Sequence, residues 1–169
     1  MVSEDERDAL EIGGLMHDIG KIGIRDAILS KPGKLTDEEY ASIKTHPALG
    51  ASILGSMPNL SRLAPLDGII RAVRSHHERP DGAGYPDGLS GLEISRTARI
   101  LAIADVWDAL TTDRSYRRGM SRDEAWTVMQ NGSGNQFDAD FLAAFRKLVY
   151  SGATECLETV STRFGLTRS

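Results

Sequence analysis

The chain has 169 residues, of which 40% are hydrophobic and 26% charged, as expected for one globular domain with a sizeable core. Its net charge is −4, so no overall basic field indicates binding to DNA, RNA or an anionic membrane surface. The single cysteine, Cys156, excludes an intramolecular disulfide and a cysteine-based zinc site. No apolar run has transmembrane length and the N-terminal sequence lacks a signal-peptide hydrophobic region, so we expect a cytoplasmic protein with no membrane segment.

The first half of the chain contains predicted helices that lead to histidines. Ser3 begins Ser-Glu-Asp-Glu, a capping box with an acidic first turn, which predicts a helix running towards His17. Thr36 begins Thr-Asp-Glu-Glu, a second capping box, and its helix leads to His46 with Tyr40 and Ile43 on one face. Pro47 breaks that helix or starts the next one.

The middle of the chain predicts a helix followed by a long irregular loop. Pro65 can occupy the first turn of this helix, which ends near His76 and His77. Its apolar positions are Leu66, Ile69, Ile70 and Val73. The sequence HHERPDGAGYPDG then introduces glycines and prolines, so no helix is expected before about Leu92.

Three further helices are predicted after the loop. Residues 94–113, ISRTARILAIADVWDALTTD, form a mostly apolar helix that we expect to be buried on most sides. Ser121 to Glu124 is a third capping box, ahead of Ala125, Val128 and Met129. Asp138 can cap a last helix. The apolar positions of that helix are Phe141, Leu142, Phe145 and Leu148.

The fold class predicted from these patterns is all-α. No stretch alternates with period two for long, and neither an internal repeat nor an interdomain linker is evident. We therefore expect a single domain over residues 1–169, a helical bundle with one long Gly/Pro-rich loop.

The candidate functional residues are all four histidines and two aspartates in apolar surroundings. His17 and Asp18 interrupt the run Leu-Met-His-Asp-Ile-Gly, and Asp105 lies in Ile-Ala-Asp-Val-Trp, where a carboxylate is costly to bury unless it is paired or binds a cation. Imidazoles together with carboxylates suit iron, manganese or zinc better than an all-oxygen calcium or magnesium site. Asp18 can bridge two metals because a carboxylate has two oxygens, and two metals activate water for attack on a phosphoryl group.

Each of these residues has an ordinary structural explanation when taken alone. A histidine at a helix end is usually a capping residue, Asp105 could be a hydrogen-bonded buried acid, and Asp108 more often pairs with an arginine. The glycines of the loop alone would indicate only positive φ angles. These explanations account poorly for the joint pattern, which favours a metal centre.

Three segments of the sequence closely resemble the HD-GYP family, a branch of the HD-domain metal-dependent phosphohydrolases. They are HDIGKIGIRDAILSKPGKLTDEEYASIKTHPALGASIL, SHHERPDGAGYPDGLSGLEI and ARILAIADVWDALTTDRSYR. The resemblance covers roughly residues 4–148 and leaves 149–169 as a C-terminal extension. It implies an HD-domain helical bundle with a long GYP loop. It also implies hydrolysis of the bacterial second messenger cyclic di-GMP to pGpG, or onward to GMP, at a two- or three-metal centre that often holds iron or manganese.

The resemblance also implies roles for individual residues. The implied metal ligands are His17, Asp18, His46, His76, His77 and Asp105, with Asp18 bridging. Lys21 matches the lysine that contacts the scissile phosphate, and Tyr85 matches the loop residue that contacts the ligand. Arg114 and Arg117 match basic positions that hold the dinucleotide, although many relatives have lysine at the second one. Either Asp108 or a metal-bound water is a candidate proton donor to the leaving 3′ oxygen, and the expected catalytic residues are Asp18, Lys21 and Asp108.

The sequence departs from the family at its N-terminus. The resemblance implies a further helix before Ser3, with a histidine ligand and, in three-metal members, a glutamate four residues before that histidine. Here the first histidine is His17, so we expect one metal to lack a ligand and the chain to be less active than one with that helix. The uncovered apolar face would favour a homodimer.

Three functions therefore stay open. The first is a cyclic di-GMP phosphodiesterase with two divalent ions, iron or manganese before zinc, nickel or magnesium. The second is a phosphohydrolase of another nucleotide, such as cyclic GMP-AMP. The third is a weakly active signalling module that binds cyclic di-GMP. Expected partners are cyclic di-GMP, a diguanylate cyclase (GGDEF) domain and an upstream sensor or receiver domain.

Overall fold

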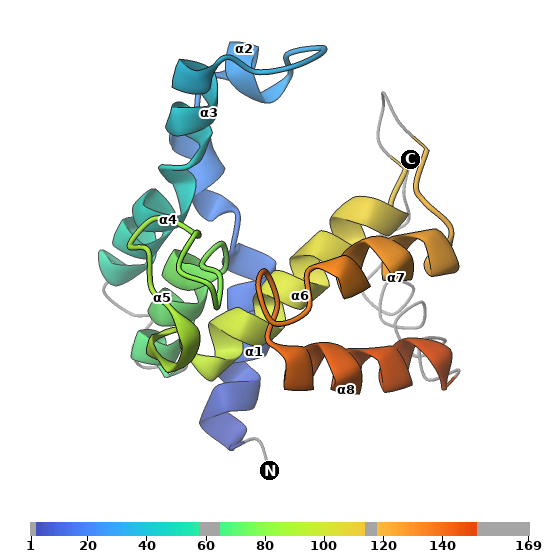
Figure 1. Ribbon diagram of the computed structural model, residues 1–169. Helices are drawn as coiled ribbons and strands as arrows, with labels where there is room; N and C mark the ends of the chain where they lie inside the picture. The colour runs from blue at the N-terminus through green and yellow to red at the C-terminus, as the bar shows by residue number, and fades with distance from the viewer. Residues whose placement is uncertain (1–2, 58–64, 114–117, 152–169) are drawn as a thin grey trace, which may run out of the picture.

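The computed structural model describes residues 3–57, 65–113 and 118–151, and within these ranges it contains helices and loops but no strand (Figure 1). This confirms the all-α class. The elements are α1 (Glu4–Met16), η1 (Ile19–Gly23), α2 (Asp26–Leu29), α3 (Asp37–Ile43), α4 (His46–Gly55), α5 (Leu66–Ser75), η3 (Gly91–Glu93), α6 (Arg96–Thr111), α7 (Arg122–Asn131) and α8 (Ala139–Tyr150).

Helices α1, α4 and α5 pack together around one hydrophobic cluster. Its buried members are Ala9, Leu54, Ile69 and Val73. Because they come from three helices, they hold the C-terminal ends of α1 and α5 and the N-terminal end of α4 in fixed relative positions. The histidines lie at these helix ends.

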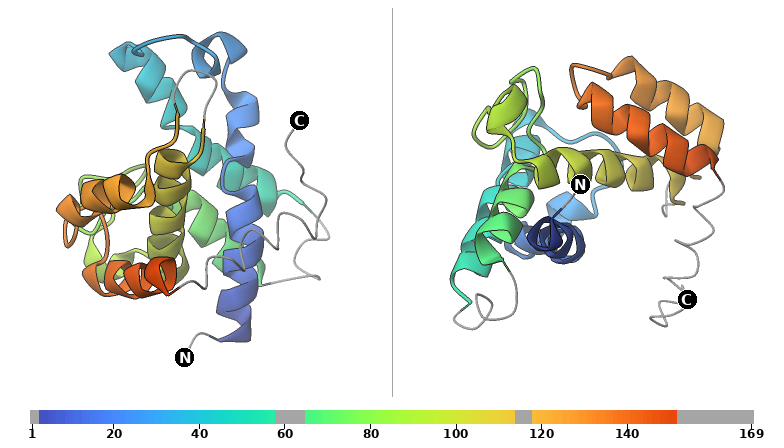
Figure 2. Two further views of the ribbon diagram at one scale, coloured as in Figure 1. Left: turned by 90° about the vertical axis from the view of Figure 1, so that its right-hand side faces the viewer. Right: turned by 90° about the horizontal axis from the view of Figure 1, so that it is seen from below.

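Helix α6 connects this group to the α7–α8 pair, as Figure 2 shows from below. Its N-terminal half packs against α1 and α5, and its C-terminal half contributes to a second cluster with α7 and α8. The buried members of that cluster are Ile103, Trp126, Met129, Phe137 and Leu142. Asp105 lies near the middle of α6 and is half-buried.

The capping predictions are confirmed. Ser3, Thr36 and Ser121 each form a complete capping box at the start of α1, α3 and α7. The Asp138 carboxylate accepts hydrogen bonds from the backbone N–H groups of Asp140 and Phe141 at the start of α8. Side-chain oxygens thus satisfy N–H groups that have no partner within the helix.

Several boundaries and exposures differ from the prediction. Helix α6 begins at Arg96 rather than Ile94, because Ser95 is the N-cap and its hydroxyl accepts from the Ala98 N–H. Val128 and Leu148, predicted on apolar faces, are each 46% exposed. The short elements η1, α2 and η3 were not predicted, since segments of three to five residues are too short for a helical period to be recognised.

Gly20 allows η1 to contact the start of α4 directly. A Cβ atom at this position would lie 2.0 Å from the His46 carbonyl oxygen and 2.6 Å from the Gly50 nitrogen. These are backbone atoms, so the clash can be relieved only by moving one element away from the other. The close approach also sets the position of Asp18 relative to His46.

We predict that Gly20→Ala lowers the free energy of unfolding by about 2–3 kcal/mol through overpacking. Urea denaturation followed by circular dichroism measures this change. Gly14→Ala is the matched control, because its Cβ would come no closer than 4.0 Å to Leu101. A loss of stability no greater for Gly20→Ala than for Gly14→Ala would contradict the prediction.

No helix in the described ranges is sufficiently long and apolar to cross a lipid bilayer.

Candidate metal centre

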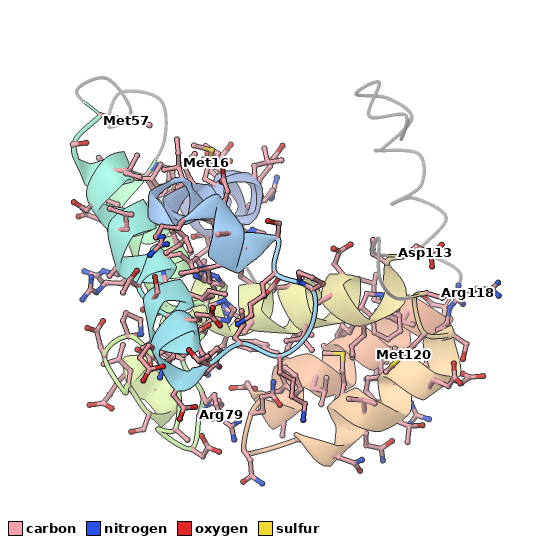
Figure 3. The ribbon with its side chains drawn as sticks, turned by 90° about the horizontal axis from the view of Figure 1, so that it is seen from above. Met16, Met57, Arg79, Asp113, Arg118 and Met120 are labelled. Carbon is pink, nitrogen blue, oxygen red and sulfur yellow. The ribbon has the colours of Figure 1, made fainter. Side chains whose placement is uncertain are left out.

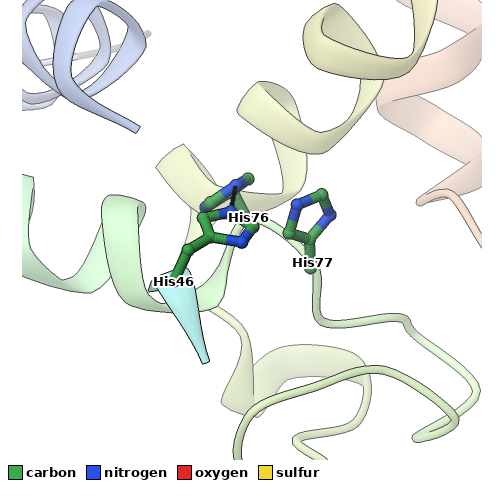
Figure 4. Close-up of side chains that lie close together, drawn as sticks. All are labelled: His46, His76 and His77. Atoms are coloured by element: carbon green, nitrogen blue, oxygen red, sulfur yellow. Dashed lines mark hydrogen bonds between the residues drawn. The ribbon is translucent and has the colours of Figure 1, made fainter. Parts of the chain in front are cut away.

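The four histidines come together from three helix ends. His17 is the C-cap of α1, His46 is the first residue of α4, and His76 is the C-cap of α5 with His77 directly after it. Figure 4 shows His46, His76 and His77 converging, and their ligand nitrogens lie within 4.8 Å of one another. The His17 ring contacts that of His76 with a centroid distance of 5.2 Å. The sequence prediction that these histidines form one site agrees with this geometry.

Backbone carbonyls orient three of the rings. The Nδ1 atoms of His17, His46 and His76 lie 2.7, 2.8 and 2.7 Å from the carbonyl oxygens of Gly14, Ile43 and Val73. A carbonyl can only accept, so each Nδ1 carries the proton and donates it. In the neutral ring the Nε2 atom then carries a free lone pair, as in histidines that bind metals.

Asp18 lies between two of these rings. Its Oδ1 atom is 3.3 Å from His46 Nε2, and its Oδ2 atom is 3.5 Å from His17 Nε2. Asp105 lies on the other side of His17, with its Oδ1 atom 3.5 Å from the same Nε2. The two Asp18 oxygens thus face different histidines, which is the arrangement that a bridging carboxylate needs.

The protonation of the rings depends on burial and on these carboxylates. Burial lowers the pKa of His46, and it lowers the pKa of His76 to about 3 and that of His77 to about 4. A hydrogen bond with Asp105 raises the pKa of His17. Burial opposes ionisation of Asp18, but Lys21 and the histidines lower its pKa overall. At neutral pH, His46, His76 and His77 are therefore uncharged and available as ligands.

The donor set fits divalent metal ions. The Nε2 atoms of His46 and His76 lie 3.3 Å apart. With both Nδ1 atoms protonated, two lone pairs face each other without a proton between them, in side chains that are each only 1% exposed. A cation bound by both nitrogens would relieve this repulsion, and Asp18 and Asp105 supply negative charge beside it.

Lys21 and Tyr85 also border the centre. The Lys21 ammonium group donates to Asp18 Oδ2 at 2.6 Å. The Tyr85 ring stacks on His77 at a centroid distance of 4.8 Å and an interplanar angle of 26°. Burial raises the pKa of Tyr85, so its hydroxyl stays protonated and can donate a hydrogen bond.

Among the predicted site residues that the structure describes, Asp108 makes no hydrogen bond or ion pair with this cluster. Asp108 is exposed, and its carboxylate accepts a hydrogen bond from the Thr112 hydroxyl at 2.9 Å. Arg114 and Arg117 lie outside the described residues. The roles predicted for these three side chains therefore stay predictions.

Glu78 is a residue that the sequence reasoning missed. It is 3% exposed and its carboxylate accepts hydrogen bonds from the backbone N–H groups of Asp87, Gly88 and Leu89, at 2.6, 3.1 and 3.0 Å. This buried acid ties the far end of the loop to the residue next to His77, and so holds Tyr85 over that histidine. The sequence could have indicated this role, because Glu78 lies between His77 and a glycine-rich loop, and such loops present backbone N–H groups that need an acceptor.

Comparison with known proteins identifies relatives over most of the chain. Residues 2–141 match the family model described as "HD domain". The "3′3′-cGAMP-specific phosphodiesterase 3" of Vibrio cholerae is 39% identical over 146 residues, which cover 86% of this chain and 30% of the relative. A cyclic di-GMP phosphodiesterase of Pseudomonas aeruginosa is 44% identical over 138 residues, which cover 82% of this chain and 32% of the relative.

A third relative is named as a regulatory protein. The cyclic di-GMP phosphodiesterase response regulator of Xanthomonas campestris pv. campestris is 44% identical over 137 residues, which cover 81% of this chain and 35% of the relative. The chain thus spans about a third of the length of these relatives. The histidine and aspartate cluster, the GYP loop and the family match agree, and the chain belongs to the HD domain family, in its HD-GYP branch.

Proposed function

We propose that the chain is a metal-dependent phosphodiesterase that hydrolyses cyclic di-GMP to pGpG, or onward to GMP. The observation that carries the proposal is the position of Asp18, with one carboxylate oxygen towards His46 and the other towards His17. A bridging acid between two groups of ligands suits a pair of metals, and paired metals suit in-line displacement at phosphorus. The relatives named as cyclic di-GMP phosphodiesterases support this substrate.

Divalent ions, when bound, would supply an activated water and neutralise charge on the phosphoryl group. The residues of this chain would hold the ions and position the phosphodiester beside them. His17, Asp18 and Asp105 would hold one side of the centre, and His46, His76 and His77 the other. Lys21 Nζ, already beside the Asp18 carboxylate, would donate hydrogen bonds to the phosphoryl oxygens as negative charge develops. Asp108 would donate a proton to the leaving 3′ oxygen, with Arg114 and Arg117 holding the dinucleotide.

Iron or manganese is the proposed metal, since imidazole and carboxylate ligands together suit these ions. The proposed setting is bacterial second-messenger signalling in the cytoplasm, with a diguanylate cyclase domain and an upstream sensor or receiver as partners. The relative named as a response regulator supports the link to signalling.

A second candidate substrate is 3′3′-cyclic GMP-AMP. Three relatives with 36–43% identity are named as phosphodiesterases specific for this molecule, among them the 39% identical protein of Vibrio cholerae. The two substrates have the same phosphodiester bonds and differ in one purine. The metal ligands therefore cannot separate them, and discrimination has to come from residues that contact the bases.

We predict that the chain loaded with Mn²⁺ or Fe²⁺ converts cyclic di-GMP to pGpG or GMP, and that EDTA abolishes the reaction because the bare residues provide no activated water. Product analysis by anion-exchange chromatography, with metal content measured on the same sample, tests this. Tight binding of cyclic di-GMP by the metal-loaded chain without turnover would instead indicate a signalling module. Faster turnover of 3′3′-cyclic GMP-AMP would favour the second candidate.

A further inference from the structure

A cavity of about 310 Å³ adjoins the metal centre on the side of His77. It is bounded by α3, the GYP loop, α6 and the connection between α7 and α8, and Figure 3 shows the loop at Arg79 beside that connection. Its lining includes His76 and His77, so a ligand phosphate at the metals would have its attached nucleoside next to this cavity. The volume is at the lower end of the range for small-molecule sites, so it suits one nucleobase better than a whole dinucleotide.

Aromatic and aliphatic side chains form about half of the cavity wall, and polar side chains such as Glu78 and Arg79 form the rest. Tyr85 is stacked on His77, and Val106 and Phe137 contribute from α6 and the α7–α8 connection. Tyr40 on α3 is 49% exposed, although the sequence pattern places it on an apolar face. An exposed tyrosine at the rim of an aromatic cavity adds nothing to the core, but it can contact the flat face of a base.

Gln136 supplies an uncharged polar group to the lining. Its side chain is half-buried, and the side-chain amide makes no hydrogen bond within the described ranges. The neighbouring Asn135 carbonyl accepts a hydrogen bond from the Asp81 N–H at 3.1 Å, which joins this connection to the GYP loop. Gln136 is thus held beside Tyr85, with one donor group and one acceptor group available to a ligand.

We infer that this cavity is the subsite for one purine of the cyclic dinucleotide, and that Gln136 determines specificity by hydrogen bonding the edge of that base. The inference rests on the proposed function and extends it to the recognition of the base. Guanine presents N–H donors next to a carbonyl acceptor on its pairing edge, and an amide can satisfy one of each. Leucine at position 136 would keep the volume but leave these base groups without partners.

The experiment compares kcat/KM for cyclic di-GMP with kcat/KM for bis(p-nitrophenyl) phosphate, a diester without bases, on the Mn²⁺-loaded chain. Gln136→Leu is expected to lower the ratio of the two values by about 3- to 10-fold, as for the loss of one or two hydrogen bonds. Tyr40→Ala is expected to lower it by roughly 5-fold or more through lost stacking, and Tyr40→Phe to keep it. Asn135→Leu is the matched control, since Asn135 is exposed and does not line the cavity.

A ratio that Gln136→Leu leaves at the unsubstituted value, or that Asn135→Leu lowers equally, would overturn the inference. A different result would contradict the proposed function itself. If the unsubstituted chain hydrolyses the base-free diester but no cyclic dinucleotide, both the proposed function and the purine subsite are overturned.

Discussion

Asp18→Asn is expected to lower kcat for phosphodiester hydrolysis by roughly 10³-fold, because the substitution removes the charged oxygen pair that faces both groups of ligands. An amide offers one neutral oxygen, so the substitution cannot reproduce a bridge between two cations. It also removes the negative charge of the acceptor that holds Lys21 at 2.6 Å. We expect the metal content of the purified variant to fall together with the rate. Elemental analysis and steady-state kinetics on the same preparation measure both.

Asp67→Asn is the matched control for Asp18→Asn. Asp67 is an exposed carboxylate in the first turn of α5, the helix that leads to His76. It should retain both metal and activity. If Asp18→Asn kept full metal content and an unchanged kcat, Asp18 would not be a bridging ligand. The double variant His17→Ala/Asp18→Ala would then show whether this end of the centre takes part in hydrolysis at all.

Glu78→Ala is expected to lower the free energy of unfolding by about 2–4 kcal/mol, since three partly buried backbone N–H groups would lose the buried carboxylate that accepts their hydrogen bonds. Glu78→Gln keeps one acceptor oxygen and should lose less. Freed from Glu78, the loop would also hold Tyr85 less firmly on His77, so KM should rise in the variant that still folds. Urea denaturation, with kinetics on Glu78→Gln, tests both effects.

Glu93 provides the comparison for Glu78. Its carboxylate also accepts hydrogen bonds near the loop, from the Ser90 N–H and the Ser90 hydroxyl, but it is exposed to solvent. Water can replace the Glu93 carboxylate as the acceptor. We therefore expect Glu93→Ala to lower the free energy of unfolding by about 1 kcal/mol, as for a lost helix cap. Equal losses of stability for Glu78→Ala and Glu93→Ala would show that burial of the Glu78 carboxylate is unimportant.

The helices of this protein could be predicted where local signals are strong. The capping boxes at Ser3, Thr36 and Ser121 specify the starts of α1, α3 and α7. In each box, side chains and backbone N–H groups three residues apart form hydrogen bonds with each other, and these bonds do not depend on the rest of the fold. The start of α6 was misplaced because Ile94 is apolar and buried without being helical. Local periodicity does not distinguish a buried residue inside a helix from one just before it.

The candidate centre was predictable as a set of residues but not as a geometry. His-Asp at positions 17–18 and the adjacent histidines at 76–77 stand out by composition alone. The direction of each Asp18 oxygen depends on packing between helices distant in sequence. The carbonyl partners of His17, His46 and His76 are local, each three residues before its histidine. Glu78 was missed for a related reason, since its function depends on a loop that returns to it after nine to eleven residues.

The placement of His17 and His76 as C-caps gives the centre an electrostatic polarity. Two helices, α1 and α5, end there and one, α4, begins there, so the helix termini together add a net partial negative charge to the charges of Asp18 and Asp105. This field attracts cations and repels a dianionic dinucleotide. Bound metal ions, with Lys21, would reverse its sign. The substrate should therefore bind after the metals, and its affinity should decrease as the metal occupancy of the centre decreases.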